Sequence, residues 1–314
     1  MESVPVPGLD RSGGPSGGAG TAASGRPAPP LRRVPAPAFF ATSATFHYLG
    51  PALAVLLFAQ VNVLGVAWLR IASAALVFAV WRRPWRLLRR LDRAQLATLL
   101  GLGAVLAVMN TAFYLAVDRL PLSTVGAIEF LGTVLLAAAG VRTVRNLLAL
   151  ALAVGGVLVL TNIRLVAEPL GFVFAFANCG LFMLYVVLGH RIANSTPAGG
   201  GGRWSGIDQL GAAMLIAALV VTPIGLTGAL PAFGHPVLLL AGAGVGICSS
   251  VVPYVSDQLA MARLRRSTFS LLLAILPATA TVLGLIVLHQ WPTVPDIAGV
   301  ALVIAGVATH RQAA

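Results

Sequence analysis

The sequence predicts an all-α membrane protein with ten transmembrane helices, arranged as two inverted five-helix repeats. Three observations support this fold class. The composition is strongly apolar, the chain after residue 38 divides into ten apolar runs, and the two halves resemble each other at an offset of 144 residues.

The composition excludes a water-soluble protein. Hydrophobic residues make up 58% of the 314 residues, charged residues only 10%, and the mean hydropathy is +0.91. A soluble globular protein carries about 25% charged residues. Soluble enzymes, secreted disulfide scaffolds and disordered proteins are therefore excluded. The two cysteines, Cys179 and Cys248, lie in apolar runs without a metal-binding spacing, and we expect them to pack as small apolar residues.

The net charge of +12 comes entirely from arginine, because the chain has no lysine. The 21 arginines are distributed over many short loops. A nucleic-acid-binding protein would gather them on one face or one helix, so we expect no nucleic-acid partner. This distribution is typical of the charge bias that orients membrane proteins.

The first 38 residues are rich in proline, glycine, serine and alanine and lack the apolar core of a signal peptide. Such a segment cannot bury enough apolar surface to become ordered. We expect residues 1–38 to form a disordered cytoplasmic tail, residues 39–162 the first repeat, and residues 163–314 the second repeat.

A helix needs about 20 apolar residues to cross the hydrocarbon core of a bilayer. Proline, glycine or arginine separates one apolar run from the next. The predicted helices cover residues 40–59, 63–81, 95–117, 122–140, 146–162, 170–190, 208–228, 236–258, 268–288 and 295–309. The fifth and tenth runs are short, so a nine-helix arrangement is the alternative.

Arginine placement predicts the orientation of these helices. With the N-terminus in the cytoplasm, eighteen arginines fall on the cytoplasmic side, six of them within 82–93. Two fall on the opposite side, Arg119 and Arg164, and Arg70 lies within a helix. Positive residues favour the cytoplasmic side, so we expect a multi-pass cell-membrane protein with both termini in the cytoplasm.

The two halves match at several positions: 119–120 with 263–264, 123–124 with 267–268, and 140 with 284. Each half holds five predicted helices. Because five is odd, the second half enters the membrane in the opposite orientation. Inverted repeats with a binding site near the midplane recur among secondary transporters.

The segment FYLAVDRLPLSTVGAIEFLG at 113–132 resembles the EamA-type carriers of the drug/metabolite transporter superfamily, in particular the threonine/homoserine exporter subgroup. Similar stretches are VAWLR at 66–70, RPWRL at 83–87 and VVPYVSDQLAMARLRRSTFSLLLAILPATATVLG at 251–284. The resemblance covers nearly all of the chain after residue 40. It implies a carrier of small metabolites.

The chain departs from the family pattern at three places. Thr133 stands where the family often has proline, Leu276 where it often has glutamate before the proline of the second repeat, and His289-Gln290 where it has Gly-Glu. The last two departures remove acidic groups. The resemblance therefore identifies the family and leaves the substrate and the coupling open.

Glu129 is the clearest candidate for a coupling residue. It lies about seven residues, or roughly 10 Å, from the outer end of its helix. An ionisable side chain within a transmembrane helix is costly and marks a functional site by default. A coupling glutamate would bind a proton and the substrate in competition, so that each drives release of the other. The alternative is a structural carboxylate, paired with Arg70 or with neighbouring backbone.

Three further polar residues lie at a similar depth on other predicted helices: Arg70, Asn110 and Asn178. Together with Glu129 they predict a polar cavity for a zwitterion. Arg70 would bind the carboxylate, since arginine and carboxylate form bidentate hydrogen bonds, and Glu129 would face an ammonium group or a proton. The alternatives are an Arg70–Glu129 ion pair and interhelical hydrogen bonds from the two asparagines.

Other candidates are weaker. Tyr114 follows Asn110 by one helical turn and is predicted to line the cavity wall. Tyr254 is the partner of Asn110 at the repeat offset and is predicted to line the same cavity. Asp257 lies near the cytoplasmic end, where a surface ion pair with nearby arginines and a proton relay are the two interpretations. His47 can titrate near neutral pH, but a lone membrane histidine usually packs through a hydrogen bond.

We therefore expect a secondary transporter that exports a small metabolite, with an amino acid as the first choice, by proton-coupled alternating access. The expected partners are the lipid bilayer, a small solute and protons, without a cofactor or a metal ion; a homodimer is left open. The alternatives are an uncoupled facilitator, an importer of another metabolite, or a membrane-embedded regulator. No catalytic motif of a membrane enzyme occurs, so we do not expect an enzyme.

Overall fold

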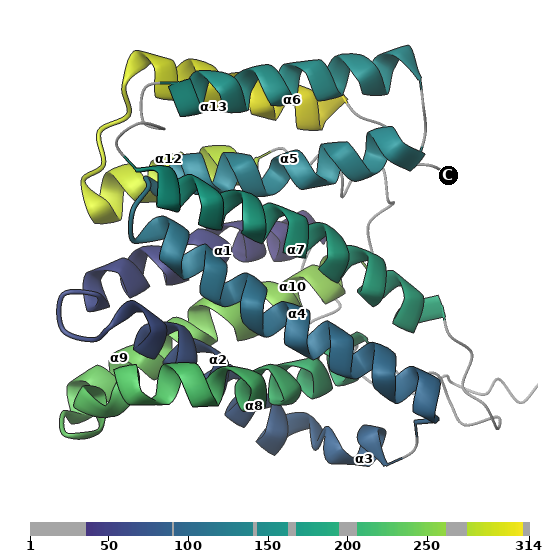
Figure 1. The fold of residues 1–314 in the computed structure, drawn as a ribbon, viewed down its shortest axis with the longest axis vertical. Coiled ribbons are helices and arrows are strands. Elements are labelled where there is room, and N and C mark those ends of the chain that lie inside the picture. Colours follow the sequence, from purple (N-terminus) through teal and green to yellow (C-terminus); the bar gives the residue numbers. More distant parts are fainter. Residues whose placement is uncertain are drawn as a thin grey trace, which may run out of the picture. The chain divides into compact units, whose positions relative to one another are not determined.

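A computed structural model of the chain describes residues 36–89, 91–140, 143–162, 168–194, 206–261 and 275–309. Within these residues the secondary structure is helical, and none of them forms a β-strand (Figure 1). The predicted tail, apart from its last three residues, lies outside this part of the chain.

The helices follow the predicted apolar runs, except that residues 268–274 of the ninth run lie outside the described part of the chain. They are α1 (Ala36–Leu57), α2 (Val63–Arg82), α3 (Trp85–Leu88), α4 (Arg93–Val117), α5 (Leu122–Gly140), α6 (Val144–Asn162), α7 (Pro169–Asn194), α8 (Gly206–Phe233), α9 (Pro236–Gly246), the π-helix η2 (Ile247–Val251), α10 (Val252–Met261), α12 (Leu276–Leu288) and α13 (Val294–Thr309). Two features differ from the prediction. The short helix α3 lies in the arginine-rich segment, and the run 236–258 is divided by the π-helix.

Six helical segments are long and apolar enough to cross a membrane: Ala38–Leu57, Val63–Arg82, Arg93–Val117, Pro169–Gly189, Gly206–Phe233 and Pro236–Asp257. Four apolar segments are shorter: Leu122–Leu136, Val144–Leu160, Leu276–Leu288 and Val294–Thr309. The prediction of a helical multi-pass membrane protein is confirmed at this level. Ten crossings in two inverted repeats stay a prediction.

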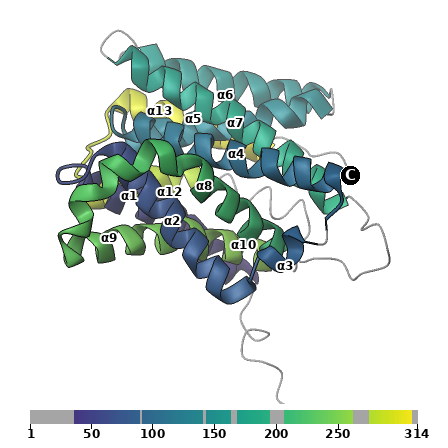
Figure 2. The same cartoon turned by 60° about the horizontal axis from the view of Figure 1, so that its bottom comes forward.

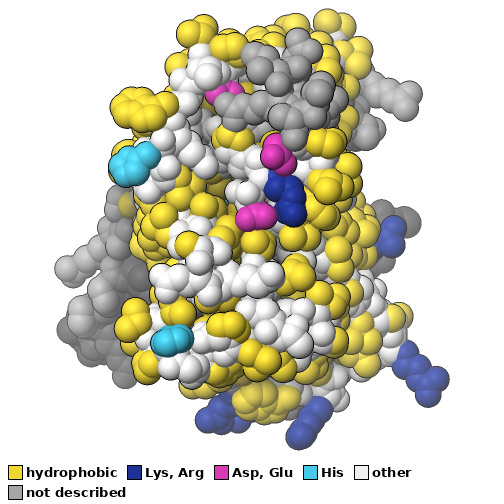
Figure 3. All heavy atoms as spheres, turned by 60° about the vertical axis from the view of Figure 1, so that its left-hand side comes forward, with side chains coloured by type: hydrophobic (Ala, Val, Ile, Leu, Met, Phe, Trp, Pro, Cys, Tyr) yellow, Lys and Arg dark blue, Asp and Glu magenta, His cyan; other side chains and the backbone are white. Residues whose placement is uncertain are grey.

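The surface supports a lipid environment. Large hydrophobic side chains are exposed on several helices, and Figure 3 shows hydrophobic atoms over much of one face. Val80, Leu219 and Val237 are 74%, 68% and 76% exposed. A soluble monomer rarely exposes so much contiguous apolar surface, whereas lipid tails solvate it.

Helix α5 is packed on several sides by other helices. It packs against α6, α7, α12 and α13, and every side chain from Leu122 to Gly132 is buried. Around it, α1 packs against α10 and α12, α2 against α8, and α4 against α7. Two views show α6 and α13 side by side (Figures 1 and 2). A polar residue in the first half of α5 is therefore enclosed by protein.

Successive helices alternate in direction. Figure 1 shows the turns α1–α2, α4–α5, α8–α9 and α12–α13 together on its left and the α3–α4 turn on its right. Those on the left are among the loops predicted to face away from the cytoplasm. The assignment of the two sides stays a prediction.

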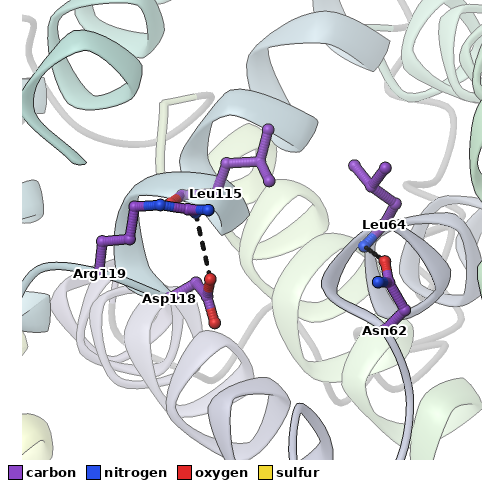
Figure 4. Close-up of polar contacts among 5 residues, drawn as sticks. All are labelled: Asn62, Leu64, Leu115, Asp118 and Arg119. Carbon is purple, nitrogen blue, oxygen red and sulfur yellow. Dashed lines mark hydrogen bonds and ion pairs between the residues drawn. The ribbon is translucent and has the colours of Figure 1, made fainter. Parts of the chain in front are cut away.

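Polar side chains cap helix ends at two of these turns (Figure 4). Oδ1 of Asn62 accepts a hydrogen bond of 2.9 Å from the backbone N–H of Leu64, which satisfies a free donor at the start of α2. At the end of α4, Arg119 donates from Nη1 to the Leu115 carbonyl at 2.9 Å and pairs with Asp118 at 3.1 Å. A cation at a helix C-terminus complements the helix dipole.

Glycine allows the closest helix crossing. A Cβ atom on Gly65 of α2 would lie 2.6 Å from the backbone nitrogen of Ala229 in α8 and would also overlap Gly228. Small residues at such a crossing let two backbones approach, which is how helices associate in lipid without a hydrophobic driving force. This crossing holds α2, and with it Arg70, against the second half of the chain.

Candidate functional site

Several polar side chains are buried among the helices at the core of the described structure. They come from α1, α2, α4, α5, α7, η2 and α10: Ser43, Arg70, Asn110, Glu129, Asn178, Ser249, Ser250 and Ser256. Burying polar groups is costly unless each finds a partner. The hydrogen-bond and ion-pair partners of these side chains therefore define the chemistry of the cluster.

Glu129 is 5% exposed and is held by α7 and α1. Nδ2 of Asn178 donates a hydrogen bond of 3.2 Å to its Oε1 atom. On the other side, Nε2 of His47 lies 3.9 Å from its Oε2 atom, which makes an ion pair when the imidazole is protonated. Oε2 accepts no hydrogen bond from the described residues. One oxygen of the carboxylate is thus fixed, and the other faces a titratable group.

Tyr48 adds a second contact from α1. Its hydroxyl lies against Gly126, where a Cβ atom would come within 2.9 Å of it, and it interacts electrostatically with Glu129. Gly126 precedes Glu129 by about one helical turn, so both lie on the same face of α5. The missing side chain at Gly126 leaves room for the Tyr48 hydroxyl beside this face of α5.

Arg70 is 5% exposed and is anchored to the π-helix. Nε donates to Oγ of Ser250 at 3.0 Å, and Nη2 donates to the backbone carbonyl of Ser249 at 3.1 Å. Pro253 has no N–H to donate to the Ser249 carbonyl four residues before it, so the guanidinium supplies a donor there. Its Cζ atom also lies 5.1 Å from the ring centroid of Tyr114. π-Helical turns are frequent at functional sites.

These contacts bear on the ion pair that is the alternative for Arg70 and Glu129. Among the described side chains, no ion pair joins Arg70 to Glu129. Arg70 is instead turned toward the serines of η2, while Glu129 is turned toward α1 and α7. The two opposite charges are therefore separately held. A guanidinium has five N–H donors, and these two hydrogen bonds use two of them.

Asn110, Tyr114 and Tyr254 complete the cluster. The Asn110 side chain donates to the Leu106 carbonyl of its own helix at 2.7 Å. Tyr254 interacts with Asn110, and its hydroxyl lies within electrostatic range of both Arg70 and Glu129. The structure thus brings six of the predicted residues together: Arg70, Asn110, Tyr114, Glu129, Asn178 and Tyr254.

Asp257 lies three residues beyond Tyr254 on α10 and interacts electrostatically with it. It interacts electrostatically with His47 and Ser43 of α1. The hydroxyl of Ser43 also donates to the Pro253 carbonyl at 3.2 Å. The surface ion pair predicted for Asp257 would use arginines at 263 and 265, which lie outside the described residues. His47 consequently lies within electrostatic range of two carboxylates, Glu129 and Asp257.

From the sequence, His47 is expected to pack through a hydrogen bond, and the contacts of Ser43, Tyr48, Ser249 and Ser250 are not predicted. The available signal was spacing. Ser43 and His47 are four residues apart and so share one face of a mostly apolar helix. The Ser249–Ser250 pair comes just before Pro253, where a helix loses a backbone hydrogen bond. Neither pattern identifies its partner without the fold.

No group of three His, Cys, Asp or Glu side chains that could hold a metal ion occurs among the described residues. Cys179 is buried and Cys248 is partly buried, and both are free thiols.

Comparison with known proteins identifies transporters that are similar to this chain. The EamA-like transporter family matches residues 170–310. The threonine/homoserine exporter RhtA of Salmonella typhimurium strain LT2 is 31% identical over 259 residues, which cover 82% of this chain and 84% of the exporter. RhtA of Escherichia coli strain K12 is 31% identical over 261 residues, with the same coverage of both chains.

A solved structure described only as "Crystal structure of protein" has a similar fold. It aligns with a TM-score of 0.56 and 19% identity, over 87% of this chain and 95% of its own. At that identity the likeness concerns the fold alone. The identity with the RhtA exporters extends over most of both chains, and the chain therefore belongs to the EamA-type transporters of the drug/metabolite transporter superfamily.

Proposed function

We propose that this transporter exports an amino acid across the cell membrane in exchange for protons, by alternating access. The observation that carries the proposal is the environment of Glu129. It is a buried carboxylate with one oxygen fixed by Asn178 and the other turned toward His47. The similarity to exporters named for threonine and homoserine supports an amino acid as the solute.

The separate anchoring of Arg70 and Glu129 suits a zwitterion. An amino acid presents a carboxylate and an ammonium group on one carbon. Arg70 has donors left for the carboxylate, and Glu129 has an acceptor left for the ammonium group. Tyr254, within electrostatic range of both charges, would contact the substrate between them.

The proton would leave Glu129 by way of α1. His47 lies within electrostatic range of Glu129 and of Asp257, which is near the predicted cytoplasmic end of its helix. Imidazole is the side chain best suited to pass a proton near neutral pH. A proton that entered from the far side would thus leave through His47 and Asp257, after which Glu129 is free to bind the next substrate.

The packing pattern supports the inverted repeat on which alternating access would depend. The repeat pairs α1 with α7, α2 with α8, α4 with the α9–α10 segment, α5 with α12 and α6 with α13. Under this pairing, the contact between α4 and α7 corresponds to the contact between α10 and α1. The contact between α5 and α7 corresponds in the same way to the contact between α12 and α1. The α2–α8, α5–α12 and α6–α13 contacts are unchanged when the members of each pair are exchanged.

Counterflow in liposomes tests the substrate class. Purified protein is reconstituted into liposomes loaded with one unlabelled amino acid, and uptake of the labelled amino acid is followed. We expect accumulation with threonine or homoserine, and none in protein-free liposomes. Failure to accumulate any amino acid would contradict the proposal. Net efflux of the amino acid down its own gradient without any proton movement would favour the uncoupled facilitator.

A further inference from the structure

A pocket lies beside the end of α2, away from the buried cluster. Its volume is about 500 Å³, and α2, α3 and the start of α8 line it. The walls include three arginines and one aspartate, Arg82, Arg83, Arg86 and Asp208, together with the apolar side chains of Val80 and Trp81.

Arg82 and Asp208 form the fixed part of this pocket. Nη2 of Arg82 lies 2.7 Å from Oδ1 of Asp208, and Nε donates to the same oxygen at 2.8 Å. This pair joins the end of α2 to the first turn of α8. Since the two charges neutralise each other, the pocket keeps the positive charges of Arg83 and Arg86.

The backbone holds Arg83 and Arg86 at the same site. Arg83 ends α2 in the left-handed conformation, with φ of 51°, and Pro84 then starts the turn into α3. The backbone N–H of Arg86 donates to the Arg83 carbonyl at 3.0 Å, and the buried Leu87 anchors α3. Both arginine side chains are exposed, and both line the pocket.

An apolar wall continues from the pocket along α2. Leu76 and Val80 are 66% and 74% exposed, and their spacing of four residues puts them on one face of the helix. Trp81 and Trp85 are 51% and 41% exposed beside the arginines, as expected of tryptophans at the boundary between membrane and water. Such an apolar surface would not stabilise a free inorganic anion, whereas the acyl chain of a lipid can pack against it.

We propose that this pocket binds an anionic phospholipid. The phosphate of its headgroup would lie between Arg83 and Arg86, and one acyl chain would follow Leu76 and Val80 along α2. Basic pockets between transmembrane helices on the cytoplasmic side bind anionic headgroups in this manner. The bound lipid would strengthen the junction of α2, α3 and α8.

Native mass spectrometry and thermal unfolding of the detergent-purified full chain test this site. The probes are phosphatidylglycerol, phosphatidylcholine and inorganic phosphate. The pocket variant is Arg83→Gln/Arg86→Gln. The control variant is Arg93→Gln/Arg191→Gln, which removes the same charge from two exposed arginines that do not line the pocket.

We expect phosphatidylglycerol to bind and stabilise the wild type and the control variant more than phosphatidylcholine does. The pocket variant should lose about thirtyfold in affinity, at the usual contribution of two basic residues to anionic-lipid binding. Equal binding by the two variants would overturn the proposal, as would equal stabilisation by inorganic phosphate, which would make this an anion site only. If the double variant does not fold, Arg86→Gln alone serves, with Arg93→Gln as its control.

Discussion

Asn178 donates a hydrogen bond of 3.2 Å from Nδ2 to Oε1 of Glu129, and so ties the buried carboxylate of α5 to α7. This bond sets the direction of the second oxygen, Oε2, which faces His47 of α1 at 3.9 Å. Glu129 is thus in contact with two different helices. Movement of either helix would change the contacts of the carboxylate, which is what coupling between protonation and transport requires.

Replacing Asn178 tests the importance of this orientation. Asn178→Leu removes the donor at similar side-chain volume. A hydrogen bond to a charged group contributes about 1.5–3 kcal/mol, so we expect the KM for the exported amino acid to rise roughly tenfold or more. Initial rates of counterflow measure it. An unchanged KM would show that Asn178 only packs the interface between α5 and α7.

Replacing Arg70 tests the carboxylate site. Arg70→Lys keeps the charge but loses the planar fork that contacts Ser249 and Ser250 and the stacking on Tyr114. We expect transport to fall at least roughly tenfold, since two charge-assisted hydrogen bonds are lost. Arg119→Lys, at the end of α4, is the matched control and should transport at the wild-type rate. Full activity of Arg70→Lys would mean that a positive charge alone suffices.

Replacing His47 separates proton movement from solute movement. His47→Gln keeps a polar side chain that cannot titrate. We expect solute-driven proton flux to fall at least roughly tenfold while exchange of labelled for unlabelled solute continues, because exchange needs no net proton transfer. The two fluxes are measured on the same liposomes. If both fell together, His47 would be part of substrate binding and not of the proton route.

Gly65 tests the packing of α2 on α8. Gly65→Ala places a Cβ atom 2.6 Å from the Ala229 nitrogen, and we expect a loss of about 1–3 kcal/mol of stability through overpacking. Gly180→Ala on α7 is the control, since nothing lies within 4 Å of its Cβ position. That variant should be neutral or gain up to about 1 kcal/mol from helix propensity. Thermal unfolding in detergent measures both variants. Equal stability would contradict the close crossing.

Sequence reasoning predicted the helices and most members of the cluster, because both follow from local properties. Apolar runs broken by proline, glycine and arginine mark the helices. A charged or amide side chain within such a run stands out, as Glu129, Arg70 and Asn178 do. The repeat offset also linked Tyr254 to Asn110, and the structure brings these two side chains together.

The pairing of these residues could not be predicted in the same way. The hydrogen bonds of Arg70 depend on a π-helix and on the carbonyl preceding Pro253 by one turn, which a hydropathy pattern does not reveal. The contact between His47 and Glu129 joins residues 82 positions apart and depends on how α1 crosses α5. A single sequence shows that polar residues share a depth, but not which of them meet.

Comparing two carboxylates tests most directly whether Glu129 couples proton flux to amino-acid transport. Liposomes containing a pH-sensitive dye are prepared with the wild type, with Glu129→Gln, and with Glu168→Gln, an exposed glutamate at the start of α7. A threonine gradient is then imposed and proton flux is recorded. We expect flux in the wild type and in Glu168→Gln, and none in Glu129→Gln. Threonine-driven proton flux that survives in Glu129→Gln would contradict this coupling role.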